Sequence, residues 1–403
     1  GNNTAYSLSL YNLKAYAMQS PVLRKDWEII IIQKPLITLP YRNNVIESLY
    51  EEIVSCSPKI VGFSCYMWNI DVVKILSDMI VQGNNDIDIC WGGPEIARDY
   101  IRDGYFNSGS ANLLIGGEGE AVYTELLKAY SENTPSNDIK GLAHRKNIKD
   151  DFVLNDKQDI FTSIESVPSP YLAGIVEDEL LFRRNIEANI ESQRGCNLRC
   201  SYCIYHKDMP KVVYSTSERV KNELRFILNK GVTKIRFVDA NFTSDIIRKK
   251  DDSQAKDIIR YLIENKYRTK LFFELIPGFI DEEFAELLGE FNSIDDFNEI
   301  TVGVGVQTIN LEILKTVRRR IKKEKFDITF DLLQKNNVFC KIDLIIGLPG
   351  EKLDSIATTQ EYMINKLENG SSHLLCCHVM RGLPGTELMD IAKEHDMVFS
   401  SEN

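Results

Sequence analysis

Three cysteines lie within one short segment, Cys196-Asn-Leu-Arg-Cys200-Ser-Tyr-Cys203. Cysteine thiolates are the usual ligands of iron–sulfur clusters, and a cubane cluster takes four ligands. Three thiolates on one loop would therefore leave one iron open to a ligand from outside the protein. Zinc is the main alternative metal, but the nearby His206 fits the usual spacing of structural zinc sites poorly. The spacing thus predicts a [4Fe–4S] cluster on Cys196, Cys200 and Cys203.

The other six cysteines fall into two groups. Four of them are scattered through apolar runs, where cysteines usually act as small core residues: Cys56, Cys65, Cys90 and Cys340. The remaining two are adjacent, at positions 376 and 377. A long chain with no secretion signal does not favour a disulfide framework, so we treat all nine as thiols.

The elements around the cysteine segment alternate between strands and helices. A strand is expected within residues 184–194, just before Cys196. Further strands are expected at Lys234–Asp239, Lys270–Leu275, Glu299–Gln307, Val338–Gly347 and His373–Met380. Helical patterns separate them, among others at Thr216–Asn229, Asp281–Phe291 and Thr358–Leu367. Such alternation is typical of an α/β fold with a parallel sheet.

The first 135 residues show a similar alternation. Strands are expected at Glu28–Ile32, Lys59–Ser64, Ile87–Trp91 and Asn112–Ile115. Helices are expected at Tyr11–Met18, Asn44–Ser55, Asp71–Val81 and Glu120–Tyr130. This pattern predicts a Rossmann-like open parallel sheet with both faces covered. We expect domains at 1–135 and 186–390, a linker at 136–185, and a C-terminal extension at 391–403.

Two glycine-rich turns follow the last two strands of this first region. They read Gly92-Gly93-Pro94-Glu95 and Gly116-Gly117-Glu118-Gly119-Glu120. Glycine allows a backbone to turn sharply or to approach a ligand closely, and ligands of open α/β sheets bind beyond the carboxyl ends of the strands. The turns therefore fit either tight strand-to-helix connections or a ligand site.

The C-x₃-C-x₂-C spacing, with Tyr202 before the third cysteine, resembles the signature of the radical S-adenosylmethionine (SAM) superfamily. The resemblance covers residues 186–390 and implies an enzyme with a partial (β/α)₆ barrel. It also implies that the open iron of the cluster binds SAM.

The resemblance further implies SAM contacts from four residues: Asp239, Glu274, Gln307 and Arg319. The segment Gly347–Glu351 resembles the turn that lies near the adenine. The glycine-rich second-strand motif of the superfamily has no literal match, which leaves contacts to the SAM amino group open. Lys315–Lys325 also fits a solvated helix face, whereas an unpaired buried carboxylate at Glu274 would be costly.

The two glycine-rich turns together resemble the cobalamin-binding domain that precedes the barrel in many radical SAM enzymes. This resemblance covers about residues 5–130. The chain contains no Asp-x-His-x-x-Gly signature, and the helix at Tyr11–Met18 has no strand before it. Some relatives bind cobalamin without that histidine, so binding stays open. We expect cobalamin to be absent or dispensable here, and the domain to act as a scaffold or docking surface.

Side chains alternate along a strand, so only one of Cys376 and Cys377 can face the interior of the barrel. Active sites of such barrels lie at the carboxyl ends of the strands, which favours Cys377, or failing that Cys376. A thiol can donate a hydrogen atom to a carbon radical. The alternative is that both cysteines are packing residues.

This arrangement resembles the radical SAM peptide epimerases of proteusin biosynthesis. The resemblance implies conversion of L- to D-residues in a ribosomally made precursor peptide that carries a leader. The 5′-deoxyadenosyl radical would take the Cα hydrogen, and the thiol would return one. The main alternative is a cobalamin-dependent radical SAM methyltransferase acting on an unactivated carbon. A non-enzymatic iron–sulfur scaffold has no use for Glu274 and Gln307.

The net charge and the apolar runs of the chain limit the classes of partner that we expect. The 403-residue chain has a net charge of −11, which disfavours non-specific binding to nucleic acid or anionic membranes. No apolar run approaches the roughly 20 residues of a membrane span, and the start lacks signal-peptide features. We therefore expect a cytoplasmic enzyme whose partners are the precursor peptide and an electron donor for the cluster.

Overall fold

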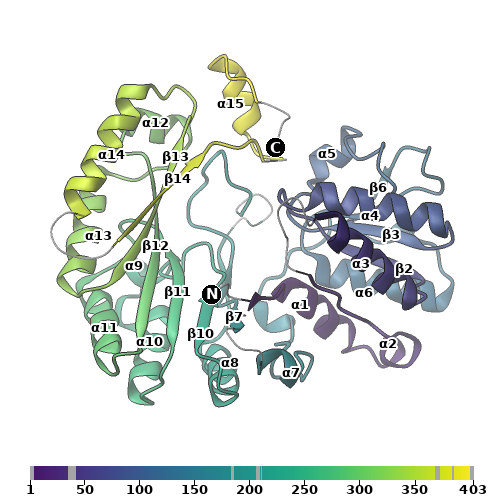
Figure 1. Cartoon of the computed structure of the whole chain (residues 1–403), viewed down its shortest axis with the longest axis horizontal. Helices are drawn as coiled ribbons and strands as arrows, with labels where there is room; N and C mark the ends of the chain where they lie inside the picture. The colour runs from purple at the N-terminus through teal and green to yellow at the C-terminus, as the bar shows by residue number, and fades with distance from the viewer. Residues whose placement is uncertain are drawn as a thin grey trace.

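The computed structural model describes residues 4–34, 42–182, 186–205, 209, 211–367, 373–383 and 385–399. It contains two large sheets, each with its own helices (Figure 1). One belongs to the barrel and the other to the N-terminal domain. The α/β fold class expected from the sequence is confirmed, with a parallel barrel sheet and a second, open sheet.

The barrel sheet has seven parallel strands in the order β1-β7-β10-β11-β12-β13-β14. Their bounds are β1 (Thr4–Ala5), β7 (Ile186–Ile190), β10 (Lys234–Phe237), β11 (Lys270–Leu275), β12 (Glu299–Gln307), β13 (Phe339–Ile346) and β14 (Leu374–Val379). Every strand expected from residue 186 onward is present, because the alternation of apolar and polar residues there is long and regular.

Helices cover the outer face of this sheet (Figure 1). They are α8 (Ser217–Asn229), α9 (Ile246–Lys249), α10 (Gln254–Glu264), α11 (Glu282–Ser293), α12 (Leu311–Thr316), α13 (Lys323–Lys335) and α14 (Leu353–Leu367). The side chains of Thr216 and Asp281 accept hydrogen bonds from the first turns of α8 and α11, as N-cap residues do. Along β12, alternate residues such as Val302 and Val304 are fully buried in the helix-covered core. Their neighbours Gly303 and Gly305 therefore face the concave inner side, which we call the lumen.

The N-terminal sheet has five strands in the order β2-β3-β4-β5-β6. Its strands are β2 (Ile60–Ser64), β3 (Asp88–Gly92), β4 (Leu113–Ile115), β5 (Leu142–His144) and β6 (Val153–Leu154). The helices of this region are α1 (Leu8–Ala17), α2 (Pro21–Asp26), α3 (Arg42–Ser55), α4 (Ile70–Gly83), α5 (Arg98–Arg102) and α6 (Gly119–Glu132). Strands β2 to β4 are parallel, but β5 and β6 add to the sheet in antiparallel orientation.

Two expectations for this region are corrected. The sheet extends through β5 and β6 into residues that we had expected to form a linker. The segment 28–32 forms no strand, although it is strongly apolar. Its neighbour Gln33 instead accepts a hydrogen bond from the backbone of Ser7 and donates one to the hydroxyl of Tyr11. Side chains, rather than a strand ladder, therefore hold this segment.

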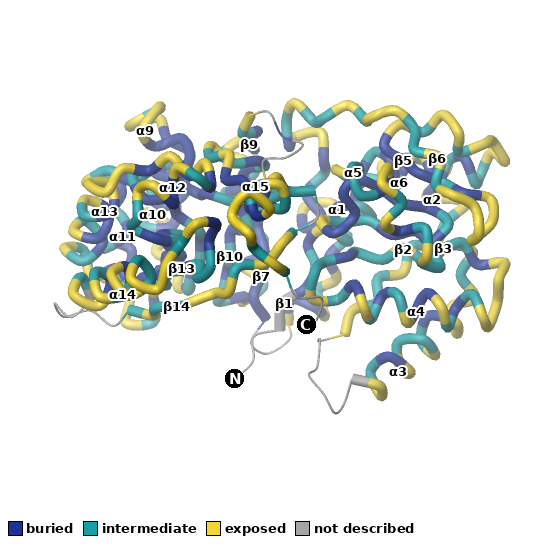
Figure 2. The backbone as a smooth tube through the Cα atoms, turned by 90° about the horizontal axis from the view of Figure 1, so that it is seen from above, coloured by how far each residue is buried: buried dark blue, intermediate teal, exposed yellow. Residues whose placement is uncertain are grey.

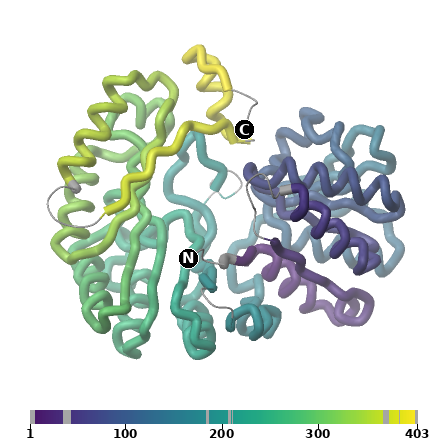
Figure 3. Tube along the Cα trace, viewed as in Figure 1, coloured from purple at the N-terminus to yellow at the C-terminus, as the bar shows by residue number. Residues whose placement is uncertain are grey.

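The chain begins in the barrel sheet rather than in the N-terminal one. Strand β1 precedes α1, where we expected no strand, and Thr4 and Ala5 pair with Ile186 and Glu187 of β7. The tube trace in Figure 3 shows this start lying between the two sheets. Behind it, Asn189 donates a hydrogen bond to the carbonyl of Tyr6 at 2.8 Å.

Smaller elements complete the chain. They are the 3₁₀ turns η1 (Ser136–Asp138), η2 (Ile164–Ser166) and η3 (Lys250–Asp252), the helices α7 (Asp178–Leu181) and α15 (Leu388–Glu394), and the strand pair β8 (Gln193–Arg194) and β9 (Val213–Tyr214). Figure 2 shows that α15 has an exposed outer side. Its Leu388 is nonetheless fully buried, in a cluster with Cys200 and Tyr202. None of the described helices has the length and apolar character needed to cross a bilayer.

Candidate active site between the barrel and the N-terminal domain

The three clustered cysteines lie on a loop that leaves β8. Gly195 opens the loop with φ +89°, and a side chain there would meet the carbonyl of Lys211 at 3.1 Å. Cys200 is buried, whereas Cys196 and Cys203 are half-buried. Burial raises the pKa of Cys196, and it raises that of Cys203 to about 11. The thiols of Cys196 and Cys203 are therefore protonated until a metal draws off their protons.

Within the described ranges, no three His, Cys, Asp or Glu side chains form a ready-made metal site. The three thiols are nonetheless electrostatic neighbours: Cys200 acts on both Cys196 and Cys203. Because metal binding and local ordering are coupled, this donor set fits a cluster that gathers the loop around it. His206, the residue that raised the zinc alternative, lies outside the described residues.

Arg319 is the buried member of the arginine triplet, whereas Arg318 and Arg320 are exposed. Its Nη1 donates to Cys200 Sγ at 3.5 Å and to the Tyr202 hydroxyl at 3.4 Å, and its Nη2 donates to the carbonyl of Gly305. Burial lowers its pKa, but the Tyr202 hydroxyl and the Cys200 thiol more than offset this and leave the pKa raised. Arg319 thus holds a fixed positive charge against the cysteine loop, where it favours the thiolate form.

Gln307 lies beside Arg319 in an unusual backbone conformation. Its φ is +68°, and the pairing of β12 with β13 shifts register between Gly305 and Gln307. Its Oε1 atom is buried without a hydrogen-bond partner, as is the hydroxyl of Ser201. Buried polar atoms are nearly always paired, and strained backbone concentrates at functional sites. The unpaired amide oxygen of Gln307, in a strained backbone beside Arg319, therefore fits a polar ligand such as the methionine part of SAM.

Glu274 projects from β11 into the lumen and packs over Gly303. Burial raises its pKa and the nearby Asp343 raises it further, against the opposing charges of Lys341 and Arg236. Among the described residues its carboxylate has no hydrogen-bond or ion-pair partner. It is therefore open to a ligand in the lumen, and its contact with SAM stays a prediction.

Asp239 lies differently from what the resemblance implied. Its carboxylate is 2% exposed and accepts hydrogen bonds from the backbone and hydroxyl of Ser192, at 2.8 and 2.5 Å. It also accepts one from the backbone of Gln193 at 3.0 Å. Burial raises its pKa to about 7. The side chain thus holds the chain just before the cysteine loop and has little capacity left for a ligand.

The preference for Cys377 as the inward thiol is corrected. Cys377 is in register with Leu344, whose side chain packs in the helix-covered core, and the amide of Gln360 on α14 lies 3.8 Å from its sulfur. Cys376 is in register with Asp343, whose Oδ1 lies 2.8 Å from Nε2 of His378 in the lumen. Nearness to the end of the strand favoured Cys377, but the register with β13 decides which face each side chain takes.

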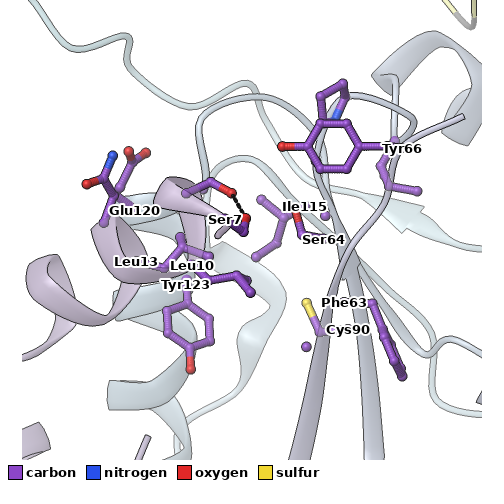
Figure 4. Close-up of a pocket in the computed structure, with 18 of the residues that line it drawn as sticks. Ser7, Leu10, Leu13, Phe63, Ser64, Tyr66, Cys90, Ile115, Glu120 and Tyr123 are labelled. Carbon is purple, nitrogen blue, oxygen red and sulfur yellow. Dashed lines mark hydrogen bonds between the residues drawn. The ribbon is translucent and has the colours of Figure 1, made fainter. Parts of the chain in front are cut away.

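A cavity of about 2190 Å³ separates the barrel from the N-terminal sheet. The carboxyl ends of β2, β3 and β4 open into it, and Figure 4 shows Leu10 and Leu13 of α1 across from Phe63 and Cys90. From the barrel it is lined by lumen residues, including Asn189 and Arg236, and by Tyr205 of the cysteine loop. Small-molecule pockets usually measure about 300–1,000 Å³, so this one has room for a large cofactor together with a substrate.

Both glycine-rich turns line this cavity. Gly93 has φ +101°, and a side chain there would meet the backbone oxygen of Cys65 at 2.8 Å. Gly117 has φ +106°, while Gly62 on β2 faces open space. The backbone therefore comes close to the cavity at several points, which fits the ligand-site interpretation of the turns.

One residue of the site was missed by the sequence analysis. Arg194, just before the cysteine loop, forms ion pairs with Glu118 and Glu120 of the second glycine-rich turn. The only signal in the sequence was an arginine next to the cysteine segment and two glutamates in a glycine-rich turn. Nothing in their spacing brings two segments so far apart in the chain together.

The sequence of the chain is similar to one protein family and to several known proteins. Residues 190–363 match the family model of the radical SAM superfamily. The ribosomal protein uS12 methylthiotransferase RimO of Petrotoga mobilis is 23% identical over 171 residues, which cover 42% of this chain and 38% of that protein. A tRNA-2-methylthio-N(6)-dimethylallyladenosine synthase of Clostridium botulinum is 23% identical over 227 residues, covering 55% and 49%. The chain thus spans at most about half the length of these relatives.

Solved structures of two enzymes match nearly the whole chain. The radical SAM methyltransferase TsrM of Kitasatospora setae, with tryptophan substrate and a SAM analogue bound, has a TM-score of 0.68 and 16% identity. It matches 96% of this chain and 73% of its own. The cobalamin-dependent SAM radical enzyme OxsB, with aqua-cobalamin and SAM bound, has a TM-score of 0.72 and 18% identity, and the match covers 100% and 60%. These similarities concern the fold of both domains.

Proposed function

We propose that the chain, whose residues 190–363 match the radical SAM superfamily, is a cobalamin-dependent enzyme that methylates an unactivated carbon. The match implies a [4Fe–4S] cluster and SAM as cofactors. The observation that carries the proposal is the cavity, which joins the two glycine-rich turns to the lumen and the cysteine loop. Both structural neighbours match nearly the whole chain in fold, and the OxsB structure holds aqua-cobalamin and SAM.

The barrel residues that we assign to the cluster and to SAM lie on one side of the cavity. Cys196, Cys200 and Cys203 would hold the cluster, and Gln307 and Glu274 would orient SAM in the lumen. When bound, the cluster supplies electrons for SAM cleavage and cobalamin supplies methyl-group transfer. Arg319 holds a positive charge beside the cysteine loop. The apolar core between the sheet and its helices keeps water from reaching the lumen through the outer side of the barrel.

The cavity favours cobalamin against our expectation from the sequence. A corrinoid needs a broad, open floor, and Gly62, Gly93 and the carboxyl ends of the strands offer one. No described histidine lines the cavity, so a lower axial imidazole has no source among the described residues. Phe63 and Cys90 line the cavity beside these strands (Figure 4) and would contact a corrinoid bound there.

The test is to reconstitute the full chain anaerobically with iron, sulfide and hydroxocobalamin and to remove unbound corrinoid. We expect about one cobalamin per chain in the visible spectrum. With SAM and a reductant, we expect release of S-adenosylhomocysteine, the by-product of methyl transfer, only when cobalamin is bound. A chain that binds no cobalamin, or that releases 5′-deoxyadenosine alone, contradicts the proposal.

Peptide epimerisation is the second candidate, and the position of Cys376 favours it. The register of β14 directs this thiol to the lumen, where a hydrogen donor would be needed. An epimerase would release 5′-deoxyadenosine without S-adenosylhomocysteine and would leave one solvent deuterium at Cα of each inverted residue. The precursor peptide and the electron donor stay predictions for either function.

A further inference from the structure

One arginine joins the two domains across the cavity. Arg194 Nη1 lies 2.9 Å from Glu118 Oε1, and its Nη2 lies 2.5 Å from Glu120 Oε1. Within the barrel, its Nε and Nη2 bind the two carboxylate oxygens of Glu191, at 2.8 and 3.0 Å. Charge-assisted hydrogen bonds to three carboxylates fix the plane of the guanidinium. We call these four residues the Arg194 cluster.

The Arg194 cluster is largely withdrawn from water. Its side chains are exposed by 13% at Arg194, 14% at Glu118, 8% at Glu120 and 20% at Glu191. A buried ion pair that loses one partner leaves a charge without compensation, which is strongly unfavourable. The two sides of the cluster therefore stay together as long as each keeps its charge.

Each side of the cluster continues into a functional segment. Cys196 follows Arg194 after a single glycine, so their Cα atoms are at most about 7 Å apart. On the other side, Glu118 and Glu120 belong to the glycine-rich turn that lines the cavity. Glu118 is itself held in place, because its Oε2 accepts a hydrogen bond from the backbone of Phe161 at 3.1 Å. A displacement of this turn would therefore reach the first cluster cysteine through one side chain.

We propose that Arg194 is a positioning residue that couples the turn at Gly116–Glu120 to the cysteine loop. A ligand bound on this turn then changes the affinity of the cluster for SAM, and SAM changes the affinity for that ligand by the same factor. The identity of the ligand rests on the proposed function, whereas the coupling itself does not.

The first test measures SAM binding through the electron paramagnetic resonance signal of the reduced cluster, with and without hydroxocobalamin. In the wild type we expect the two dissociation constants to differ by at least about fivefold, the lower end of ordinary allosteric coupling. Arg194→Gln changes none of the residues assigned to the cluster or to SAM, and in this variant the constants should converge. Arg194→Lys keeps the charge but not the geometry, and should restore part of the difference.

Arg219→Gln is the matched control. Arg219 also pairs with a glutamate, Glu223, at 3.1 Å and similar burial, but it lies on α8 and contacts neither Gly116–Glu120 nor the cluster cysteines through any hydrogen bond described for it. It should keep the wild-type difference. When hydroxocobalamin is seen to bind, equal constants in the wild type, or an unchanged difference in Arg194→Gln, would overturn the coupling; absence of hydroxocobalamin binding rejects the proposed function, and the second test then decides the coupling.

The second test needs no cobalamin and leaves the barrel sequence intact. In the double variant Glu118→Gln/Glu120→Gln, only the N-terminal domain is changed. We expect amide hydrogen exchange in residues 195–205 of the reconstituted protein to rise severalfold, because the loop loses its anchor. Unchanged exchange there contradicts the coupling even if Arg194→Gln fails to fold. Failure of cobalamin binding with raised exchange would instead reject only the proposed function.

Discussion

The guanidinium of Arg319 donates from Nη1 to the sulfur of Cys200, 3.5 Å away, although the two residues are 119 positions apart in the chain. The same side chain also binds the carbonyl of Gly305 at the register shift of β12. It therefore connects the cysteine loop with the strand end that carries Gln307.

Replacing Arg319 by methionine should weaken cluster binding. The change keeps an unbranched stem but removes the charge beside Cys200 and leaves the carbonyl of Gly305 without its donor. An unpaired buried group costs about 1–3 kcal/mol, so we expect lower iron and sulfide content after reconstitution and a lower unfolding midpoint. Arg320→Met, at the exposed neighbouring residue, is the control. It should retain the wild-type iron and sulfide content and the wild-type unfolding midpoint. Equal iron content in the two variants would refute this role.

Asp239 should make the stability depend on pH. Its pKa is raised by burial to about 7 in the folded protein, from an ordinary value of 3.8. Between these values the folded state holds a proton that the unfolded state has lost. The contribution of Asp239 to the free energy of unfolding therefore falls as the pH rises from about 4 to 7. The fall is at most about 1.4 kcal/mol per pH unit.

Asp239→Asn should remove this slope. An asparagine can keep the hydrogen bonds from the backbone of Ser192 and Gln193 without carrying a charge. Denaturant unfolding at pH 5 and pH 8 measures the difference, with Asp239→Ala as the variant that loses the hydrogen bonds at both pH values. Identical pH dependence in the wild type and Asp239→Asn would show that the carboxylate is ionised throughout.

Alanine at the two vicinal cysteines should have unequal effects. Cys377 is exposed, and its sulfur lies 3.8 Å from the amide of Gln360 on the helix side, so Cys377→Ala should retain folding and turnover. If the chain is an epimerase, Cys376→Ala should abolish deuterium uptake at Cα while 5′-deoxyadenosine is still formed. If it is a methyltransferase, Cys376→Ala should leave S-adenosylhomocysteine release in place. Loss of activity in Cys377→Ala alone would contradict the orientation of β14.

Two glycines on the cavity floor form a matched pair. Gly93→Ala forces a side chain onto φ +101° and against the backbone of Cys65, which should cost about 1–3 kcal/mol and impair cobalamin binding. Gly62→Ala meets nothing within 4 Å and should be neutral or stabilise by up to about 1 kcal/mol. Thermal unfolding of both variants provides the measurement. Similar losses in both would argue against strain at Gly93.

The sequence was informative where chemistry or periodicity is local. The spacing of Cys196, Cys200 and Cys203 depends on a few neighbouring residues, and β11 and β12 begin and end where the pattern predicts. Arg319 was selected from three adjacent arginines, and the structure buries that one alone.

Long-range pairing explains what the sequence could not reveal. The lumen side of β14 follows from its register with β13, which no pattern within His373–Met380 determines. Likewise, the carboxylate of Asp239 is occupied by Ser192, 47 residues earlier in the chain. Strands as short as β1 and β5 carry too few residues to show a period, and they form because a neighbouring strand edge accepts them.

The pairing of β1 with β7 has a consequence for how the domains move and fold. The N-terminal domain leaves the barrel at Ala5 and returns to the neighbouring strand at Ile186, so two covalent connections hold it at the same sheet edge. A domain tethered twice at one place can swing as on a hinge but cannot rotate freely about a single linker. The pairing of β1 with β7 also joins residues some 180 positions apart in the chain. Contacts of such high sequence separation form slowly during folding. We therefore infer that the N-terminal domain folds before the barrel closes, so that the cavity between them is the last part of the molecule to take shape.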